Sequence, residues 1–203
     1  SNALFPEDAM GVSRSSDRAE PLVDNVILML VDGLGWRFWN YYLNQHHASA
    51  INLERRGVLS CLSSCFPSTT SLHVTTVATD QSGGERGCYE WYIYEPRLNS
   101  IIAPLPFSLA GADEPDSLVH LGVSVEDVFP QRTIYEDLSE VEVESYCFQD
   151  HSICNSLCSR ALGKGANLVS FSGIKDGLAK LRKVLTASVS KRKYCYFYYH
   201  QFD

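Results

Sequence analysis

One carboxylate stands at a position where it could bind a metal ion. Asp32 follows the apolar run NVILMLV (residues 25–31) and precedes Gly-Leu-Gly. A carboxylate after a buried strand is expected at the sheet edge, and the neighbouring glycines let another group approach closely. Asp32 could therefore bind a metal ion, or it could instead cap the helix that follows.

A hydroxyl group stands at a second position that could carry chemistry. Thr70 lies in FPSTTSLHVTTVAT, where a turn is expected to enter a helix at residues 71–79. A hydroxyl at a helix N-terminus lies beside backbone N–H donors and the positive end of the helix dipole, which favours an alkoxide and a phosphate. The alternative is structural, with Ser68, Thr69 or Thr70 simply capping the helix. His73, one turn later, could donate a hydrogen bond to a phosphate or lie on the helix surface.

The elements that must position these groups alternate along the chain between strands and helices. This order predicts an α/β fold with a mainly parallel sheet and helices on both faces. Because such sheets place ligands beyond the carboxyl ends of their strands, Asp32, Thr70 and Asp203 are expected to cluster at one edge. Strands are expected at residues 25–31, 58–61, 144–148, 168–171 and 194–199, and helices at 36–57, 71–79, 133–138, 152–162 and 174–185.

The remaining segments are assigned from composition. Residues 1–24 are expected to be a loose lead-in, beginning with Ser1-Asn2-Ala3, which is typical of the remnant of an expression tag. Residues 25–203 are expected to form one catalytic unit, from which residues 80–122, rich in Gly, Pro and aromatic side chains, make an irregular excursion. A capping box is expected at Ser124 and Asp127.

The amino-acid composition limits the kinds of partner that the protein is expected to bind. The 203 residues are 45% hydrophobic and 20% charged, with a formal net charge of -7, so a globular core is expected and a broad nucleic-acid-binding face is not. No apolar run is long enough to span a membrane. The seven cysteines lack the spacing of a zinc knuckle, and we expect free, partly buried thiols in the cytoplasm.

Two motifs together carry a resemblance to a known family. The segments LVDGLG (residues 30–35) and FPSTTSLHVTTVAT (residues 66–79) resemble the type I phosphodiesterase and nucleotide pyrophosphatase branch of the alkaline-phosphatase superfamily. TIYEDL, SYCFQ, SICNSLCSRALGKGA and the aromatic strand before Asp203 are similar to later parts of that family. The resemblance spans roughly residues 25–203 and implies an alkaline-phosphatase-like fold that is truncated here.

The resemblance also implies roles for single residues. Thr70 matches the nucleophile, with Thr69 as the other candidate, and Asp32 and Asp203 match ligands of two divalent metal ions. Zinc is the expected metal, with manganese as the alternative, and Thr70 would contact one of the ions. His73 stands where nucleotide pyrophosphatases often carry an asparagine that binds the phosphate. Further ligands of the family follow the Asp203 position, so this N-terminal part is expected to bind metal weakly, or not at all, and to be inactive alone.

The function implied is hydrolysis of a phosphodiester or pyrophosphate bond in a small phosphate ester or nucleotide, through a phospho-threonine. Phosphomonoesterase, phosphonate hydrolase and phosphoglycerate mutase activities of the same superfamily are alternatives. A non-catalytic binding domain is an alternative from another class. Self-association through an exposed sheet edge is expected as a side effect of truncation.

Overall fold

The computed structural model describes residues 23–79, 88–129, 131–187 and 192–202, and these form two compact units. The first unit contains Asp32–Ser64 together with residues 200–202. The second contains Val23–Val31 and the described residues of Cys65–Tyr199. The expected lead-in, residues 1–24, lies almost wholly outside the described residues. The single catalytic unit expected from residue 25 onward stays a prediction.

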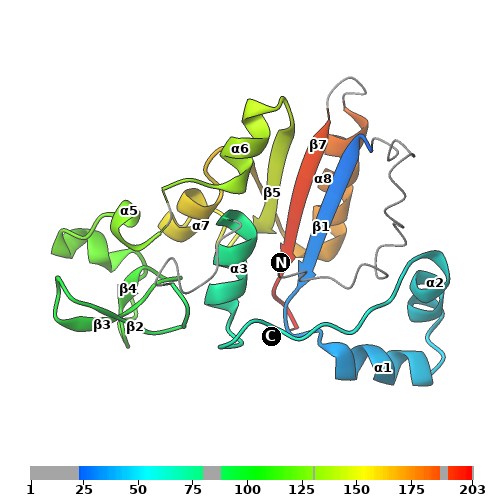
Figure 1. The fold of residues 1–203 in the computed structure, drawn as a ribbon, viewed down its shortest axis with the longest axis horizontal. Helices are drawn as coiled ribbons and strands as arrows, with labels where there is room; N and C mark the ends of the chain where they lie inside the picture. Colours follow the sequence, from blue (N-terminus) through cyan, green and yellow to red (C-terminus); the bar gives the residue numbers. More distant parts are fainter. Residues whose placement is uncertain (1–22, 80–87, 130, 188–191, 203) are drawn as a thin grey trace, which may run out of the picture. The chain divides into compact units, whose positions relative to one another are not determined.

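A four-stranded parallel sheet is the centre of the second unit (Figure 1). Its strands run in the order β1 (Asn25–Val31), β7 (Lys193–Tyr199), β5 (Glu144–Asp150) and β6 (Asn167–Phe171). All three pairings in the sheet are parallel. The α/β class and the parallel sheet are therefore confirmed, and four of the five expected strands are present.

Side chains alternate between the two faces of this sheet, and each face carries helices. Along β7, Tyr196 and Tyr198 belong to one buried cluster, and Cys195 and Phe197 belong to another. The first cluster includes side chains from α3 (Thr70–Thr79), α6 (Ile134–Glu140) and α7 (Leu157–Leu162). The second includes Leu181 of α8 (Gly173–Thr186), which runs behind β7 in Figure 1. Helices on both faces are thus confirmed.

The face under α8 is packed closely around aromatic rings. Phe197 stacks between Phe148 and Phe171, with ring centroids 5.7 and 4.9 Å away. Gly177 of α8 lies against this stack, because a Cβ built on it would come within 2.7 Å of the Phe197 ring. This close approach needs a residue without a side chain, which explains a glycine within an amphipathic helix.

Residues 88–122 contain more regular structure than the expected irregular excursion, of which residues 80–87 lie outside the described residues. An antiparallel sheet joins β2 (Ile93–Glu95), β3 (Ser100–Ala103) and β4 (Ser108–Leu109), and the 3-10 helix η2 (Ser117–Leu121) follows. Ile102, Phe107 and Leu118 are fully buried in the same cluster as Tyr196 of the main sheet. The segment therefore contributes to the core, because its apolar residues alternate with turns and pair across short strands.

The two short helices that follow this antiparallel sheet each begin with a capping box. The backbone N–H of Ser124 donates to the Asp127 carboxylate, 2.9 Å away, at the start of α5 (Val125–Val128). This reciprocal contact confirms the capping box. Thr133 accepts from the Glu136 N–H and caps α6 in the same way.

The helix expected at residues 152–162 is shorter in the structure. Asp150 accepts hydrogen bonds from both the N–H and the hydroxyl of Ser152, which holds the chain in a turn after β5. The Ser156 hydroxyl then accepts from the Ser159 N–H, so α7 begins only at Leu157. Hydrogen bonds between side chains and the backbone thus take the place of the first turn of the expected helix.

Two expectations for the first unit were wrong. The helix expected at residues 36–57 is two helices, α1 (Trp36–Asn44) and α2 (Ala48–Arg56), because His46 adopts a left-handed backbone with φ 54 that ends the first. Residues 58–61, expected as a strand, have no regular structure. Val58 is 64% exposed, and a run this short gains too little from burial to hold a strand without a partner.

Within the part of the chain that the structure describes, no helix combines the length and the apolar character needed to cross a bilayer.

Candidate functional site

Thr70 is the first residue of α3, and Thr69 is the residue that caps the helix. The Thr69 hydroxyl oxygen lies 3.4 Å from the N–H of Leu72, the third residue of α3, and accepts its hydrogen bond. The same hydroxyl donates to the carbonyl oxygen of Tyr89, 3.3 Å away. The capping role that the sequence left open therefore belongs to Thr69, whose hydroxyl both donates and accepts a hydrogen bond.

The turn before α3 is held by hydrogen bonds to the backbone. The N–H of Thr69 donates to the carbonyl of Pro67, 3.1 Å away. The N–H of Cys65 donates to Nε2 of His73, 3.2 Å away, and Nδ1 of His73 lies 2.6 Å from the Thr69 carbonyl oxygen. His73 thus contacts both ends of the segment that leads into Thr70.

One face of α3 is anchored in the core through a thiol. The Sγ atom of Cys88 is 3.3 Å from the Ser71 hydroxyl and accepts from the Thr75 hydroxyl at 3.7 Å. Burial raises the pKa of Cys88, with smaller opposing effects from the hydroxyls of Ser71 and Thr75. Cys88 is fully buried and stays a neutral thiol, so it fixes the helix and does not serve as a nucleophile.

Asp32 directly follows β1 and belongs to the first unit. Its carboxylate accepts a hydrogen bond from the N–H of Gly33, 3.1 Å away, and Gly33 has a positive φ of 74. The N-cap of α1 is Gly35, so Asp32 does not cap this helix. Of the two roles that the sequence allowed, metal binding is the one that stays open.

Strand register brings two chain positions together at the carboxyl ends of β1 and β7. Val31 is the register partner of Tyr199, and the next residues along the chain are Asp32 and His200. Asp203 lies outside the described residues. Thr70 belongs to the second unit and follows no strand directly. The clustering of Asp32, Thr70 and Asp203 at one edge therefore stays a prediction.

The donor groups that are described do not by themselves make a metal centre. No group of three or more His, Cys, Asp or Glu side chains suited to a metal ion occurs in the described ranges. Zinc in proteins takes three or four protein ligands, and Asp32 and Thr70 supply one carboxylate and one hydroxyl. The metal site that the resemblance implies therefore stays a prediction.

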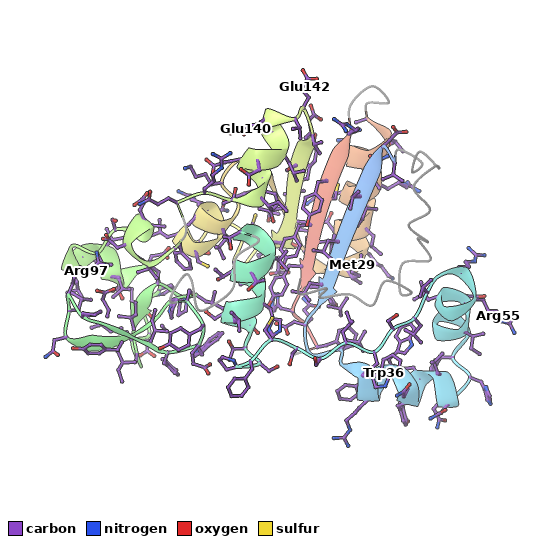
Figure 2. The ribbon with its side chains drawn as sticks, viewed as in Figure 1. Met29, Trp36, Arg55, Arg97, Glu140 and Glu142 are labelled. Atoms are coloured by element: carbon purple, nitrogen blue, oxygen red, sulfur yellow. The ribbon has the colours of Figure 1, made fainter. Side chains whose placement is uncertain are left out.

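A polar pocket of about 460 Å³ lies at the opposite, amino edge of the main sheet. It is lined by Glu144 and Asn167, the first residues of β5 and β6, and by Glu142 and Arg192. Glu142, labelled in Figure 2, follows the end of α6 and lies beside the start of β5. Ligands of parallel sheets bind at the carboxyl edge, so this pocket is not the expected site.

Sequence reasoning missed the residues that fix Thr70 in place. Tyr89 and Cys88 contact the start of α3 from about twenty residues later in the chain, and Cys65 binds His73 across the turn. No spacing rule connects these positions. The aromatic content of this stretch was the one available signal, and the side chains of Tyr89, Trp91 and Tyr92 are between 43 and 51% exposed.

Comparisons of the chain with family models, curated proteins and solved structures found no match. The resemblance to phosphodiesterases therefore depends on the motifs of the sequence.

Proposed function

We propose that the protein takes part in hydrolysis of phosphodiester or pyrophosphate bonds, with Thr70 as the nucleophile. The observation that supports this most is the position of Thr70 at the start of α3. Thr69 uses its hydroxyl to cap α3 and to bind Tyr89, while Thr70 is the first residue of a ten-residue helix. Backbone N–H groups and the helix dipole favour a phosphate at that end.

The proposed reaction has two steps. The Thr70 hydroxyl gives its proton to solvent, and its oxygen forms a bond to phosphorus as the bond from phosphorus to the leaving oxygen breaks. The leaving oxygen departs with the electron pair and takes up a proton from solvent. In the second step the oxygen of a water molecule bonds to phosphorus, the bond from phosphorus to the Thr70 oxygen breaks, and one proton of the water restores the Thr70 hydroxyl while the other passes to solvent. The second step returns Thr70 to its starting state, so the residue acts as a nucleophilic catalyst.

Two divalent ions, zinc or manganese, belong to the proposed reaction, with Asp32, Thr70 and Asp203 among their ligands. Such ions would offset the negative charge of a phosphate, which the net charge of -7 on this chain does not favour. In the family that the chain resembles, further ligands follow the Asp203 position. We therefore propose that the activity belongs to the complete gene product and expect the 203-residue chain alone to be inactive.

The proposed substrate is a small phosphate ester or nucleotide. Exposed aromatic rings follow Tyr89, whose carbonyl binds the residue next to Thr70, and such rings can stack on an organic leaving group. The acidic net charge does not favour a long nucleic acid. All seven cysteines are free, which fits a reducing compartment such as the cytoplasm.

A substrate panel tests this function. The complete gene product and the 203-residue chain are each assayed with a nitrophenyl phosphodiester, a phosphomonoester, a phosphonate and a nucleotide, with zinc, with manganese and with a chelator. We expect metal-dependent turnover of the diester or nucleotide by the complete product. Turnover of only the monoester or phosphonate would favour another activity of the same superfamily. No turnover of any substrate would leave a non-catalytic binding domain.

Elemental analysis of the dialysed 203-residue chain tests the assignment of metal ligands. We expect no stoichiometric pair of ions, because so few ligands gain little over water. A tightly bound pair in this chain, together with turnover, would show that other residues complete the site.

A further inference from the structure

We propose that His73 is a positioning residue for Thr70, which it holds through the peptide group that joins Thr69 to Thr70. This inference depends on the proposed role of Thr70 as nucleophile. It gives His73 a different task from the phosphate contact expected from the sequence, because both of its ring nitrogens bind the protein backbone.

The two hydrogen bonds together determine the tautomer of the ring. A carbonyl oxygen only accepts, so Nδ1, which lies 2.6 Å from the Thr69 oxygen, must carry the proton. A backbone N–H only donates, so Nε2, which lies 3.2 Å from the Cys65 nitrogen, must offer its lone pair. The neutral imidazole with its proton on Nδ1 satisfies both contacts at once.

The Thr69 carbonyl is the point at which His73 acts on Thr70. This oxygen also accepts from the backbone N–H of His73, 3.2 Å away, in the first hydrogen bond of α3. The ring therefore adds a second donor to one carbonyl. Because a peptide group is planar, fixing the Thr69 oxygen also fixes the nitrogen and Cα of Thr70.

The contact with Cys65 holds the other end of the same turn. Cys65 is eight residues before His73, and the turn between them carries Pro67 and Thr69. With both ends bound to one ring, the turn cannot move away from α3 without breaking a hydrogen bond. Thr69 adds its own bond to Tyr89, so the residue before Thr70 is restrained from two directions.

Two substitutions separate the hydrogen bond of His73 to Thr69 from its hydrogen bond to Cys65. In His73→Asn the side-chain amide can still donate to the Thr69 carbonyl from the position of Nδ1, but it is too short to reach Cys65. In His73→Gln the longer side chain can offer its oxygen to the Cys65 N–H from the position of Nε2. His73→Ala removes both contacts.

The first test is a spectroscopic measurement on the 203-residue chain and does not depend on turnover. Nitrogen NMR of the protein with labelled histidine, in mildly alkaline solution, measures the tautomer. The signal of His73 is the one that disappears in His73→Asn, and it should show Nδ1 protonated and Nε2 unprotonated. Amide hydrogen exchange at Cys65 should speed up roughly tenfold or more in His73→Ala and His73→Asn, and less in His73→Gln. A proton on Nε2, or unchanged exchange at Cys65 in His73→Ala, would overturn the inference.

The second test is kinetic and uses the complete gene product. We expect His73→Ala to lower kcat roughly ten- to a hundredfold with little change in KM, because displacement of a nucleophile by about 1 Å costs rate more than binding. His73→Asn should recover part of kcat, since it keeps the bond to Thr69. A rise in KM with kcat unchanged would instead indicate a substrate-binding histidine and overturn the positioning role.

The two tests separate failure of this inference from failure of the proposed function. If the wild-type protein turns over no phosphate ester, the proposed function fails, and the tautomer and the exchange at Cys65 still decide whether His73 holds the turn. If the wild type is active and all three variants keep its kcat, the positioning role alone is wrong.

Discussion

The hydroxyl of Thr69 donates to the carbonyl oxygen of Tyr89 at 3.3 Å and, on its other side, accepts from the N–H of Leu72. These two bonds join the start of α3 to a residue twenty positions later in the chain. They also distinguish two adjacent threonines that the sequence presents as near equivalents. Thr69 has a structural task, and Thr70 stays the proposed nucleophile.

The threonine pair gives the first prediction. In the complete gene product, Thr70→Ala should lower turnover of a phosphodiester at least about a thousandfold. Thr69→Ala should retain most of the activity but lower the free energy of unfolding by about 1 kcal/mol, because it removes a helix cap. Steady-state kinetics and urea denaturation measure the two effects. A loss of turnover only in Thr69→Ala would show that the motif was aligned one residue too late.

Glu95 gives a prediction about pH. The Glu95 carboxylate is buried and accepts from the backbone N–H of Arg97 at 3.0 Å and from its Nε at 2.8 Å. Hydrogen bonding from the Arg97 side chain is the largest effect and lowers the pKa of Glu95 (Arg97 is labelled in Figure 2). A lowered pKa in the folded state means that this stabilisation is present at neutral pH and is lost as the pH falls through the folded-state value.

Glu95→Gln should therefore lower the free energy of unfolding at neutral pH by about 1.5 kcal/mol and make it less dependent on pH in the acidic range. Denaturant melts of the 203-residue chain at several pH values measure this. Glu126→Gln, an exposed carboxylate on the nearby helix α5, is the control and should leave the profile unchanged. An equal change in both variants would show that general charge, not the Arg97 contact, determines the acid response.

Two glycines with the same backbone conformation give a prediction about packing. Gly165 and Gly111 have φ of 86 and 80, so alanine is strained at both. At Gly165 the added Cβ would also lie 2.8 Å from the backbone nitrogen of Glu136, whereas at Gly111 it would meet nothing within 4 Å. Thermal denaturation should show a loss of about 1 kcal/mol for Gly111→Ala and about 1–3 kcal/mol more for Gly165→Ala. Equal losses would mean that the start of α6 moves freely to make room.

Strand β1 gives a prediction about association. Val26, Ile27, Leu28 and Met29 are 40 to 46% exposed, although strands of parallel sheets are usually covered on both faces. In the order of described strands β1 is at one end of the sheet, and Figure 2 marks Met29 on it. We expect the 203-residue chain to self-associate as its concentration rises, because an apolar edge strand can pair with another copy.

Met29→Lys should reduce this association, because a charged side chain on an edge strand opposes pairing. Light scattering over a range of concentrations measures it. Leu178→Lys on α8 is the matched control, since Leu178 is 44% exposed and Met29 is 42% exposed, but only Met29 lies on the edge strand. Equal effects of both substitutions would indicate non-specific hydrophobic contact.

Much of the fold could be predicted from periodicity and local signals. The runs at residues 25–31 and 194–199 are apolar and too short for helices, which predicts the parallel strands β1 and β7. The burial expected for both strands is confirmed for β7 and wrong for β1, most of whose residues are exposed. The capping box at Ser124 and the amphipathic pattern of α8 are local features of the same kind. These predictions held because each depends on residues within one element.

Only the tertiary structure decided the features that depend on distant contacts. Residues 58–61 could not form a strand without a partner, and residues 88–122 gained order by pairing short strands over a shared core. The sequence by itself placed a hydroxyl and a carboxylate at Thr70 and Asp32 as candidates. The distinct roles of Thr69 and His73 were decided by bonds to Tyr89 and Cys65, because a hydrogen bond depends on positions in space that no sequence pattern encodes.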